Sequence, residues 1–207
     1  MHVVVPFSTD RPKTRLAAVL TPEERRDFST AMLSDVLSAL DSVPRDLDVT
    51  ILSTGPVEVE SGVDASVAVD DRALTPAVND RLDSVPTAVV MADLALASPD
   101  ALADLLGSTA DLAVAAGLGG GTNAFLSRDS AFRVDYHGAS YRDHLAIARE
   151  EGLSVREVDS RLLAVDIDEP EDLAEVLLHG DGAARDWLVD AGFELDVGGG
   201  RVEVVRE

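Results

Sequence analysis

Nine residues near the middle of the chain combine bare backbone with small polar side chains: Gly117, Leu118, Gly119, Gly120, Gly121, Thr122, Asn123, Ala124 and Phe125. Consecutive glycines weaken a strand or helix, but they let backbone N–H groups approach a ligand closely as an anion-binding nest. Thr122 and Asn123 would add a hydroxyl and an amide at the lip of this nest. The alternative is a plain loop between two strands. A second polar cluster, with His137, Gly138 and Ser140, favours a cradle for a phosphate or carboxylate.

Three basic residues stand close together in an otherwise acidic chain. Arg11, Lys13 and Arg15 follow an expected strand over residues 2–7, and Lys13 is the single lysine among 17 basic residues. Loops after the first strand of an open parallel sheet lie at its ligand-binding edge. Arginine binds oxygen atoms in pairs and lysine acts as a point charge. The loop therefore predicts a polyphosphate clamp, with a merely solvated loop as the alternative.

Carboxylates follow two further apolar runs. Asp93 ends the run 87–92, and we predict a strand over residues 162–170 whose alternation would place Asp166 and Asp168 on one face. Acids at this edge of a sheet are common metal positions. Asp93 could instead be solvated, and Asp168 could cap the helix that follows it.

The elements that must position these residues alternate between strands and helices. We predict strands over residues 2–7, 49–53, 65–69, 87–92, 111–116 and 162–170, and helices that begin near residues 21, 75, 98, 141 and 170. This alternation predicts an α/β fold in one domain over residues 1–207, with a mostly parallel sheet. Alternating residues around three glycines, over 193–197 and 201–204, predict a small C-terminal β-hairpin.

The helix expected over residues 141–151 has Ser140 as its predicted N-cap. A helix N-terminus also presents free N–H groups to an anion, so Ser140 could serve both purposes. His144 lies four residues further along the same face. We expect His144 to be partly buried and hydrogen bonded rather than catalytic.

Composition excludes several classes of function. The net charge of −22 comes from acids scattered along the chain, and such a lysine-poor surface suits molar salt, where the Debye length is about 3 Å. We therefore expect a halophile's cytoplasmic protein that does not bind nucleic acid. The absence of cysteine excludes disulfides and thiolate catalysis. No apolar run reaches membrane-spanning length, and the N-terminus lacks the features of a signal peptide.

Common phosphate-binding and hydrolase motifs are missing from the sequence. No GxGxxG follows the first expected strand, and neither a Walker-type lysine loop nor a GxSxG elbow occurs. The remaining features suit a nucleoside triphosphate, a divalent metal and a small phosphorylated acceptor. That chemistry needs positioning and charge neutralisation more than a nucleophilic side chain. A phosphate acceptor is largely ionised above a pKa of about 6, so it needs no general base.

Several segments resemble one enzyme family and stand in its order: Pro12–Leu16, Met91–Leu94, Gly119–Ala124, His137–His144 and Asp166–Leu173. The chain resembles the 2-phospho-L-lactate guanylyltransferases of coenzyme F-420 biosynthesis, in their haloarchaeal type, over roughly residues 1–178. The resemblance implies a nucleotide-diphospho-sugar transferase (Rossmann-like) fold with helices on both faces of the sheet. It also implies that the phosphate of 2-phospholactate attacks the α-phosphorus of GTP and expels pyrophosphate.

The resemblance also implies roles for single residues. The triphosphate would contact Arg11, Lys13 and Arg15, and of these Lys13 and Arg15 would be catalytic. Asp93, itself catalytic, would carry Mg²⁺ together with Asp166 or Asp168. The small phosphorylated carboxylic acid would contact Gly120, Gly121, Thr122, Asn123, His137, Gly138 and Ser140. Asn79 stands in the base-binding region.

The chain departs from the family pattern in two places, and alternatives remain. Ser8 stands where the family often has a lysine, and Ala95 where it usually has a proline. The acceptor could be phosphoenolpyruvate or 3-phosphoglycerate, or the chain could be a molybdopterin- or sugar-nucleotide-type transferase. A nucleotide-binding protein without catalysis is a further alternative. A homodimer is expected by analogy only.

Overall fold

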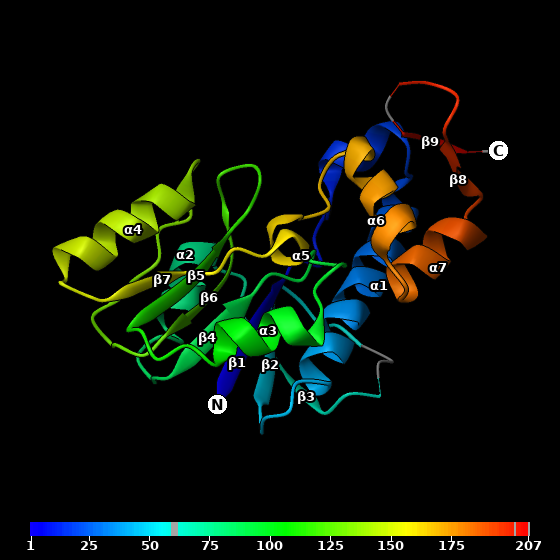
Figure 1. Cartoon of the computed structure of the whole chain (residues 1–207). Helices are drawn as coiled ribbons and strands as arrows, with labels where there is room; N and C mark the ends of the chain where they lie inside the picture. The colour runs from blue at the N-terminus through cyan, green and yellow to red at the C-terminus, as the bar shows by residue number, and fades with distance from the viewer. Residues whose placement is uncertain (59–61, 201, 207) are drawn as a thin grey trace.

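A computed structural model describes residues 1–58, 62–200 and 202–206 (Figure 1). In chain order the elements are β1 (His2–Phe7), the 3-10 helix η1 (Thr14–Ala18), α1 (Pro22–Asp41), β2 (Asp48–Ser53), β3 (Ala65–Val69), α2 (Leu74–Asn79), β4 (Thr87–Val90), α3 (Pro99–Leu106), β5 (Leu112–Ala116), β6 (Thr122–Ser127), α4 (Ser140–Glu150), β7 (Val155–Glu157), α5 (Arg161–Ala164), the 3-10 helix η2 (Pro170–Asp172), α6 (Leu173–His179), α7 (Ala183–Asp190), β8 (Phe193–Asp196) and β9 (Glu203–Arg206).

The central sheet has seven strands in the order β3-β2-β1-β4-β6-β5-β7. Every pairing is parallel except the two made by β6, which runs antiparallel to both β4 and β5. The start of β6 therefore lies at the same edge as the carboxyl ends of the parallel strands. The predicted α/β fold with a mostly parallel sheet is confirmed.

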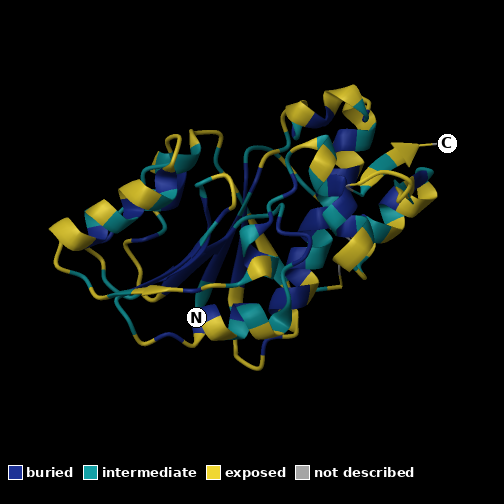
Figure 2. Ribbon diagram, turned by 45° about the horizontal axis from the view of Figure 1, so that its top comes forward, coloured by how far each residue is buried: buried dark blue, intermediate teal, exposed yellow. Residues whose placement is uncertain are grey.

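Helices cover both faces of this sheet, as predicted (Figure 1). Alternate strand residues point to opposite faces, so Val3 and Val5 pack with α1 and α3 while Val4 packs with α2. The strands β1, β2, β4, β5 and β6 form the dark, buried centre of the molecule in Figure 2. Continuous burial on both faces explains why these strands read as unbroken apolar runs.

Two helix starts follow the predicted capping chemistry. The Thr21 hydroxyl accepts the N–H of Glu24 at 3.3 Å, and the Glu24 carboxylate accepts the N–H of Thr21 at 2.8 Å. The Ser98 hydroxyl accepts the N–H of Ala101 at 3.3 Å. Within the described part of the chain, no helix is long and apolar enough to cross a membrane.

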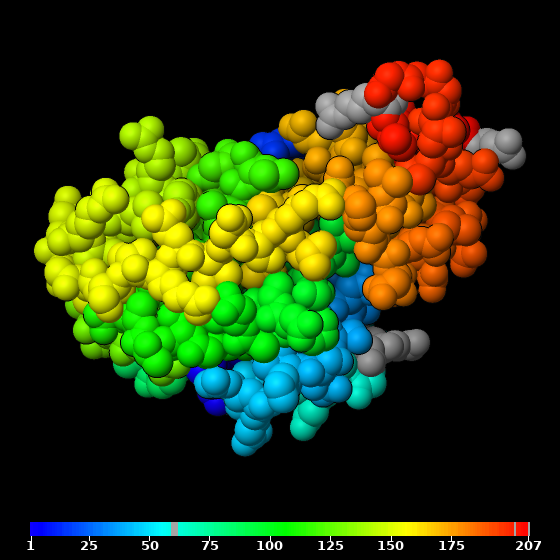
Figure 3. Space-filling model, viewed as in Figure 1, coloured from blue at the N-terminus to red at the C-terminus, as the bar shows by residue number. Residues whose placement is uncertain are grey.

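The C-terminal segment lies at one end of the molecule (Figure 3), where it packs in a second core cluster with residues from earlier in the chain. Helices α6 and α7 pack with Phe28 and Met32 of α1, and the β8–β9 hairpin is antiparallel. Arg206 holds the hairpin in place. Its Nε donates to Ala191 O at 2.9 Å, and its guanidinium carbon lies 4.9 Å from the centre of the Phe193 ring. The predicted hairpin is confirmed, although Arg201 lies outside the described residues.

One predicted strand and one predicted helix cap are wrong. Residues 162–170 do not form a strand: they continue α5, which ends at Ala164, and then run through a segment with no ladder partner among the described strands. Val165 and Ile167 are buried while Asp166 and Asp168 are half-exposed, so the alternation in the sequence reflects burial against the C-terminal core and not a sheet.

Ser140 is the first residue of α4 and not its N-cap, which is Ala139. The Ser140 hydroxyl instead accepts the N–H of Thr122, at 3.1 Å, from the neighbouring strand. Strands β6 and β7 were not predicted.

Candidate active site

A cavity of about 460 Å³ opens at the carboxyl edge of β1, β2 and β4. Its apolar lining includes Phe7, Leu52 and Leu74. Two separate charged groups also line it: Asp70 with Arg72, which follow β3, and Lys13 with Asp93 and Asp168, which lie beyond β1 and β4. The cavity therefore combines an apolar lining with a charged end at Lys13, Asp93 and Asp168.

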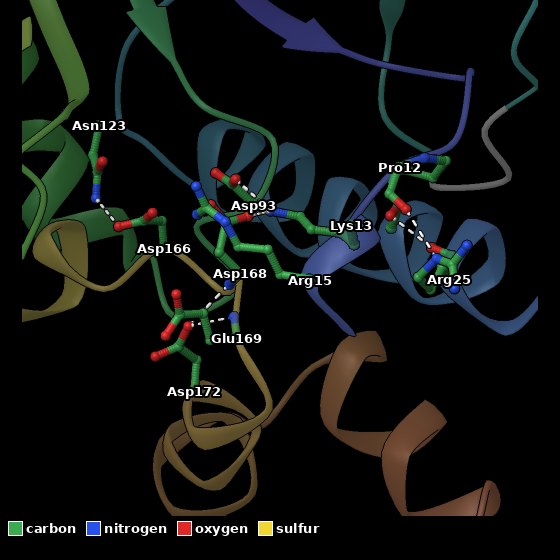
Figure 4. Close-up of polar contacts among 11 residues, drawn as sticks. Pro12, Lys13, Arg15, Arg25, Asp93, Asn123, Asp166, Asp168, Glu169 and Asp172 are labelled. Atoms are coloured by element: carbon green, nitrogen blue, oxygen red, sulfur yellow. Dashed lines mark hydrogen bonds and ion pairs between the residues drawn. The ribbon is translucent and has the colours of Figure 1, made fainter. Parts of the chain in front are cut away.

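Lys13 joins two of the predicted carboxylates at that charged end (Figure 4). Its Nζ lies 2.6 Å from Asp93 Oδ2 and 2.5 Å from Asp168 Oδ1, and Arg15 Nη1 lies 3.2 Å from Asp168 Oδ2. Burial acts to lower the pKa of Lys13, but the two carboxylates outweigh it, and the pKa is raised. The ammonium is therefore charged at any physiological pH.

A buried arginine holds the loop that carries Lys13 (Figure 4). Arg25 of α1 donates from Nε to Pro12 O at 3.2 Å and from Nη1 to Leu20 O at 3.0 Å. Arg11 and Lys13 both have positive φ, at 44° and 51°. Non-glycine residues adopt this region only when the surroundings enforce it. Sequence reasoning missed Arg25, although it stands on the apolar stripe of α1 seven residues before Met32.

One oxygen of Asp93 is left without a partner. Asp93 Oδ1 is buried and has no hydrogen bond within the described part of the chain. Burial, and then repulsion from Asp93 and Asp168, raises the pKa of the nearby Asp166 carboxyl. An orphaned carboxylate oxygen beside a second carboxylate is a donor set that fits a hard divalent cation.

These side chains offer a metal ion a pair of carboxylates and not a complete set of protein ligands. Among the described residues, no three or more His, Cys, Asp or Glu side chains are arranged as a metal site. Mg²⁺ is usually held by one or two carboxylates plus substrate phosphates, so a pair is sufficient for it.

Asn123 links the carboxylates to β6 (Figure 4). Its Nδ2 donates to Asp166 Oδ1 at 3.2 Å and to Leu163 O at 3.0 Å. A Cβ added to Gly117 would lie 2.5 Å from Asn123 Oδ1, so only glycine fits there. Asn123 therefore positions Asp166, and the glycine before the turn makes room for it.

The glycine run is a turn between two antiparallel strands, β5 and β6. Gly117 N donates to Gly121 O and Gly120 N donates to Gly117 O, both at 2.9 Å, and Gly120 has a φ of +85°. The expectation of an inward-facing N–H at Gly120 is therefore wrong, because that N–H closes the turn. A Cβ at Gly119 would meet nothing within 4 Å, so this part of the turn is open.

The first turn of α4 docks onto the glycine turn. Tyr141 N donates to Gly120 O at 3.2 Å, and Thr122 N donates to the Ser140 hydroxyl at 3.1 Å. The Thr122 hydroxyl lies 2.8 Å from His144 Nδ1. The structure thus brings Thr122 and Ser140 together, and His144 is buried and hydrogen bonded as expected.

Other predicted site residues lie apart from these groups. The Arg11 side chain is exposed and pairs with Asp10 at 3.6 Å, and His137 is exposed and bonds to Asp135. Gly138, with a φ of +42°, lies in the exposed loop before α4.

The Asn79 side-chain amide is hydrogen bonded to the backbone of a loop. Its Nδ2 donates to Val134 O at 3.0 Å and its Oδ1 accepts Val134 N at 2.8 Å. Both ends of the amide therefore hold the backbone before α4, and neither is directed to a base in this structure.

Asp70 and Arg72 are cavity residues that sequence reasoning missed. Arg72 Nη2 lies 2.6 Å from Asp70 Oδ2 and 2.5 Å from Asp80 Oδ2. The hydrogen bonds from Arg72 lower the pKa of Asp70 to about 2. The signal was present, because charged residues follow β3 as they follow β1, at the same edge of the sheet.

The fold defines a class of protein. A protein of Desulfovibrio desulfuricans described as a nucleotide-diphospho-sugar transferase superposes with a TM-score of 0.67 at 17% identity, over 91% of this chain and 94% of that one. A nucleotidyl transferase from Methanothermobacter gives a TM-score of 0.61 at 15% identity, over 86% of this chain and 97% of that one. The fold is that of the nucleotide-diphospho-sugar transferases, which confirms the prediction.

Sequence comparison gives the particular family. The description "Guanylyl transferase CofC like" matches residues 1–206, and the chain belongs to this family of nucleotidyltransferases. A 2-phospho-L-lactate guanylyltransferase of Haloarcula marismortui is 56% identical over 100% of this chain and 99% of its own. One from Haloferax volcanii is 55% identical with the same coverage. The family resemblance inferred from the five segments is confirmed.

Proposed function

We propose that this chain joins GTP to (2S)-2-phospholactate, giving lactyl-2-diphospho-5′-guanosine and pyrophosphate in coenzyme F-420 biosynthesis. Relatives that share more than half of its residues over their whole length bear the name of this activity. The structural observation that supports the proposal most directly is the buried, unpartnered Oδ1 of Asp93 beside Lys13 at the charged end of the cavity.

The cavity suits a nucleoside triphosphate. Its volume of about 460 Å³ lies in the range of small-molecule sites, roughly 300–1,000 Å³. The base and ribose would lie along the apolar wall, and the triphosphate would extend to Lys13 and Arg15. These two cations would stabilise the charge that develops on departing pyrophosphate, and Arg11 would join them from the same loop.

Asp93, with Asp166 or Asp168, would hold Mg²⁺. When bound there, Mg²⁺ would neutralise the triphosphate and polarise the α-phosphoryl group. Lys13 holds Asp93 and Asp168 close together through its two ion pairs, and Asn123 of β6 orients Asp166 through a hydrogen bond. Orientation of these carboxylates is the contribution of the chain's own residues.

The acceptor would bind between the glycine turn and the first turn of α4. Thr122 and Ser140 would donate their hydroxyls to its phosphate and carboxylate, beside Gly121 and the backbone of His137 and Gly138. An oxygen of the acceptor phosphate then attacks the α-phosphorus of GTP. The bond from that phosphorus to the β-phosphate oxygen breaks, and pyrophosphate leaves with the bonding electrons. Orientation accounts for much of the acceleration, because the nucleophile is already ionised.

The experiment is pyrophosphate release from GTP and Mg²⁺ in high salt with each phosphorylated acid in turn. We expect the fastest release with 2-phospholactate, and none when the acceptor is omitted. Faster release with phosphoenolpyruvate or 3-phosphoglycerate would reassign the acceptor. Release only with a sugar phosphate or a molybdopterin would replace the proposal with the sugar-nucleotide alternative.

The surroundings of the enzyme are part of the proposal. The net charge of −22 and relatives from salt-loving archaea support a halophilic, cytoplasmic protein. A homodimer remains a prediction, which sedimentation equilibrium in molar salt would test.

A further inference from the structure

His144 lies in a closed aromatic environment. It is fully buried, and its ring lies 5.2 Å from Tyr136, 5.9 Å from Phe132 and 6.4 Å from Phe125, between ring centres in edge-to-face arrangements. Each of its two ring nitrogens nevertheless has one polar partner, Thr122 at Nδ1 and the backbone of Asp135 at Nε2.

The backbone partner fixes the proton on the ring. Asp135 N lies 3.0 Å from His144 Nε2, and a backbone N–H can only donate, so Nε2 is the acceptor. A neutral imidazole carries one proton, which must then be on Nδ1. Burial also lowers the pKa of His144 to about 4, so the neutral ring is the form present at neutral pH.

This tautomer determines the direction of the next hydrogen bond. Nδ1–H donates to the Thr122 hydroxyl oxygen at 2.8 Å. The hydroxyl proton of Thr122 therefore cannot point to His144 and must serve another acceptor. Within the described part of the chain, no hydrogen bond takes up that proton.

The Ser140 hydroxyl has the same hydrogen-bonding pattern as the Thr122 hydroxyl. Its hydroxyl oxygen accepts the N–H of Thr122 at 3.1 Å, and the described residues provide no acceptor for its own proton. Thr122 and Ser140 are 4% and 2% exposed, so solvent competes little for these protons. Two buried hydroxyls beside the open glycine turn thus accept from the protein and have their protons left for a ligand.

We propose that His144 is a positioning residue, which orients the Thr122 hydroxyl as a donor and so makes this side of the site specific for an anionic acceptor. The inference rests on the proposed function, because the anion is the phosphorylated acid of that reaction. A segment held by α2 supplies the fixing N–H, since Asn79 binds Val134 on both sides and Thr75 accepts Tyr136 N at 3.0 Å. The Asp135 N–H that begins the relay is therefore held through both of its chain neighbours, Val134 and Tyr136.

The first test does not depend on activity. Nitrogen-detected NMR of the full chain reports which ring nitrogen carries the proton, and the chain has only four histidines to assign. We expect His144 with Nδ1 protonated and Nε2 bare at pH 7. A His144 with its proton on Nε2 overturns the inference and leaves the proposed function standing.

The second test measures coupling between His144 and Thr122. In His144→Phe we expect the KM for 2-phospholactate to rise about tenfold to hundredfold, because one hydrogen bond to a charged group is lost. The KM for GTP should change less than about threefold. Thr122→Val should do the same. The double variant should be no worse than Thr122→Val alone, because His144 acts through that hydroxyl.

Phe132→Leu is the matched control, since it loosens the aromatic environment and keeps both hydrogen bonds. It should lower the melting temperature without a selective rise in the acceptor KM. Independent, multiplying effects of His144→Phe and Thr122→Val, or equal rises in both KM values, would mean that His144 only supports the fold. Absence of pyrophosphate release by the wild-type chain with any acceptor is a failure of the proposed function, and the NMR result then still decides the tautomer.

Discussion

Asp93 links the cavity of the candidate site to the ion pair with Lys13. It lies just past β4, it lines the cavity, and its Oδ2 pairs with Lys13 while its Oδ1 has no partner among the described residues. Both oxygens therefore matter in different ways. One holds the lysine, and the other would be left for the proposed metal ion.

Asp93→Asn should abolish turnover without unfolding the chain. The amide keeps the shape of the side chain but loses the charge that would bind the metal, so we expect kcat to fall at least about 10²-fold. Lys13 retains Asp168 at 2.5 Å, so the melting temperature should stay close to that of the wild type. Steady-state kinetics and thermal unfolding measure the two effects. Asp41→Asn, at the exposed end of α1, is the control, and substantial activity in Asp93→Asn would remove Asp93 from the metal role.

His144 predicts a loss of stability in acid. Burial lowers its pKa to about 4, against the opposing charges of Asp143 and Asp135, whereas the unfolded chain titrates near 6.5. Because the unfolded state binds the proton first, this stability is present above about pH 6.5. It is lost as the pH falls towards 4, by up to about 3 kcal/mol.

Urea unfolding at several pH values compares the wild type with His144→Phe. The carboxylates titrate in both proteins, so the difference between the two curves isolates the histidine. We expect the wild type to lose more stability between pH 6.5 and 4 than the variant. Parallel curves would show that His144 takes up its proton equally well in the folded state.

At the scale of elements, the loop after β1 depends on α1. Arg25 is buried and donates to Pro12 O and Leu20 O, on either side of η1. These bonds hold a loop in which Arg11 and Lys13 have positive φ. The proposed triphosphate contacts would therefore be only as well ordered as the helix behind them.

Arg25→Met should weaken nucleotide binding more than acceptor binding. Two buried carbonyls lose their donor, which costs about 1–3 kcal/mol each if they stay dry, and the Lys13 loop becomes free to move. We expect the KM for GTP to rise about tenfold and the melting temperature to fall. The neighbouring, exposed Arg26→Met is the control. A fall in melting temperature with unchanged kinetics would limit Arg25 to a structural role.

Elements buried on a regular period were the ones that sequence could predict. The strand β1 and the helices α1 and α3 followed their apolar patterns and their caps, because local spacing decides which face is buried. The strand predicted over residues 162–170 was wrong for the same reason, because an extended segment packed against a core shows the same alternation of buried and exposed residues as a strand.

Contacts between distant residues could not be predicted. The groupings of Lys13 with Asp93, Asn79 with Val134 and Thr122 with His144 depend on which strands become neighbours. Nothing in the spacing of these residues carries that information. Sequence could therefore place the expected site residues only at one edge of the sheet, while the structure showed which of them meet and which lie apart.

At the scale of the whole molecule, charge is the dominant feature. The chain carries 39 acidic and 17 basic residues, hence its net charge of −22. Surface pairs such as Arg156–Asp104 and Arg133–Asp83 contribute at most about 1 kcal/mol each, and salt weakens them. General repulsion among the excess acids is larger, so screening should stabilise the fold overall.

The melting temperature should therefore rise with salt. Between 0.1 M and 2 M KCl we expect an increase of more than about 5 °C, equivalent to roughly 2 kcal/mol for a chain of this size. Circular dichroism at constant pH measures the change. A choline chloride series separates screening from specific binding of potassium, and a melting temperature that is flat or falls with salt would contradict the role given to repulsion.

The reversed direction of β6 puts the two proposed halves of the site on different kinds of connection. The proposed acceptor side combines the turn at residues 117–121 with Thr122 of β6 and Ser140 of α4, whereas the proposed nucleotide side comes from loops after β1, β3 and β4. A hairpin turn and the helix start that docks on it can change without altering any crossover between parallel strands. A change of acceptor in this fold would therefore leave the loops of the proposed nucleotide side in place.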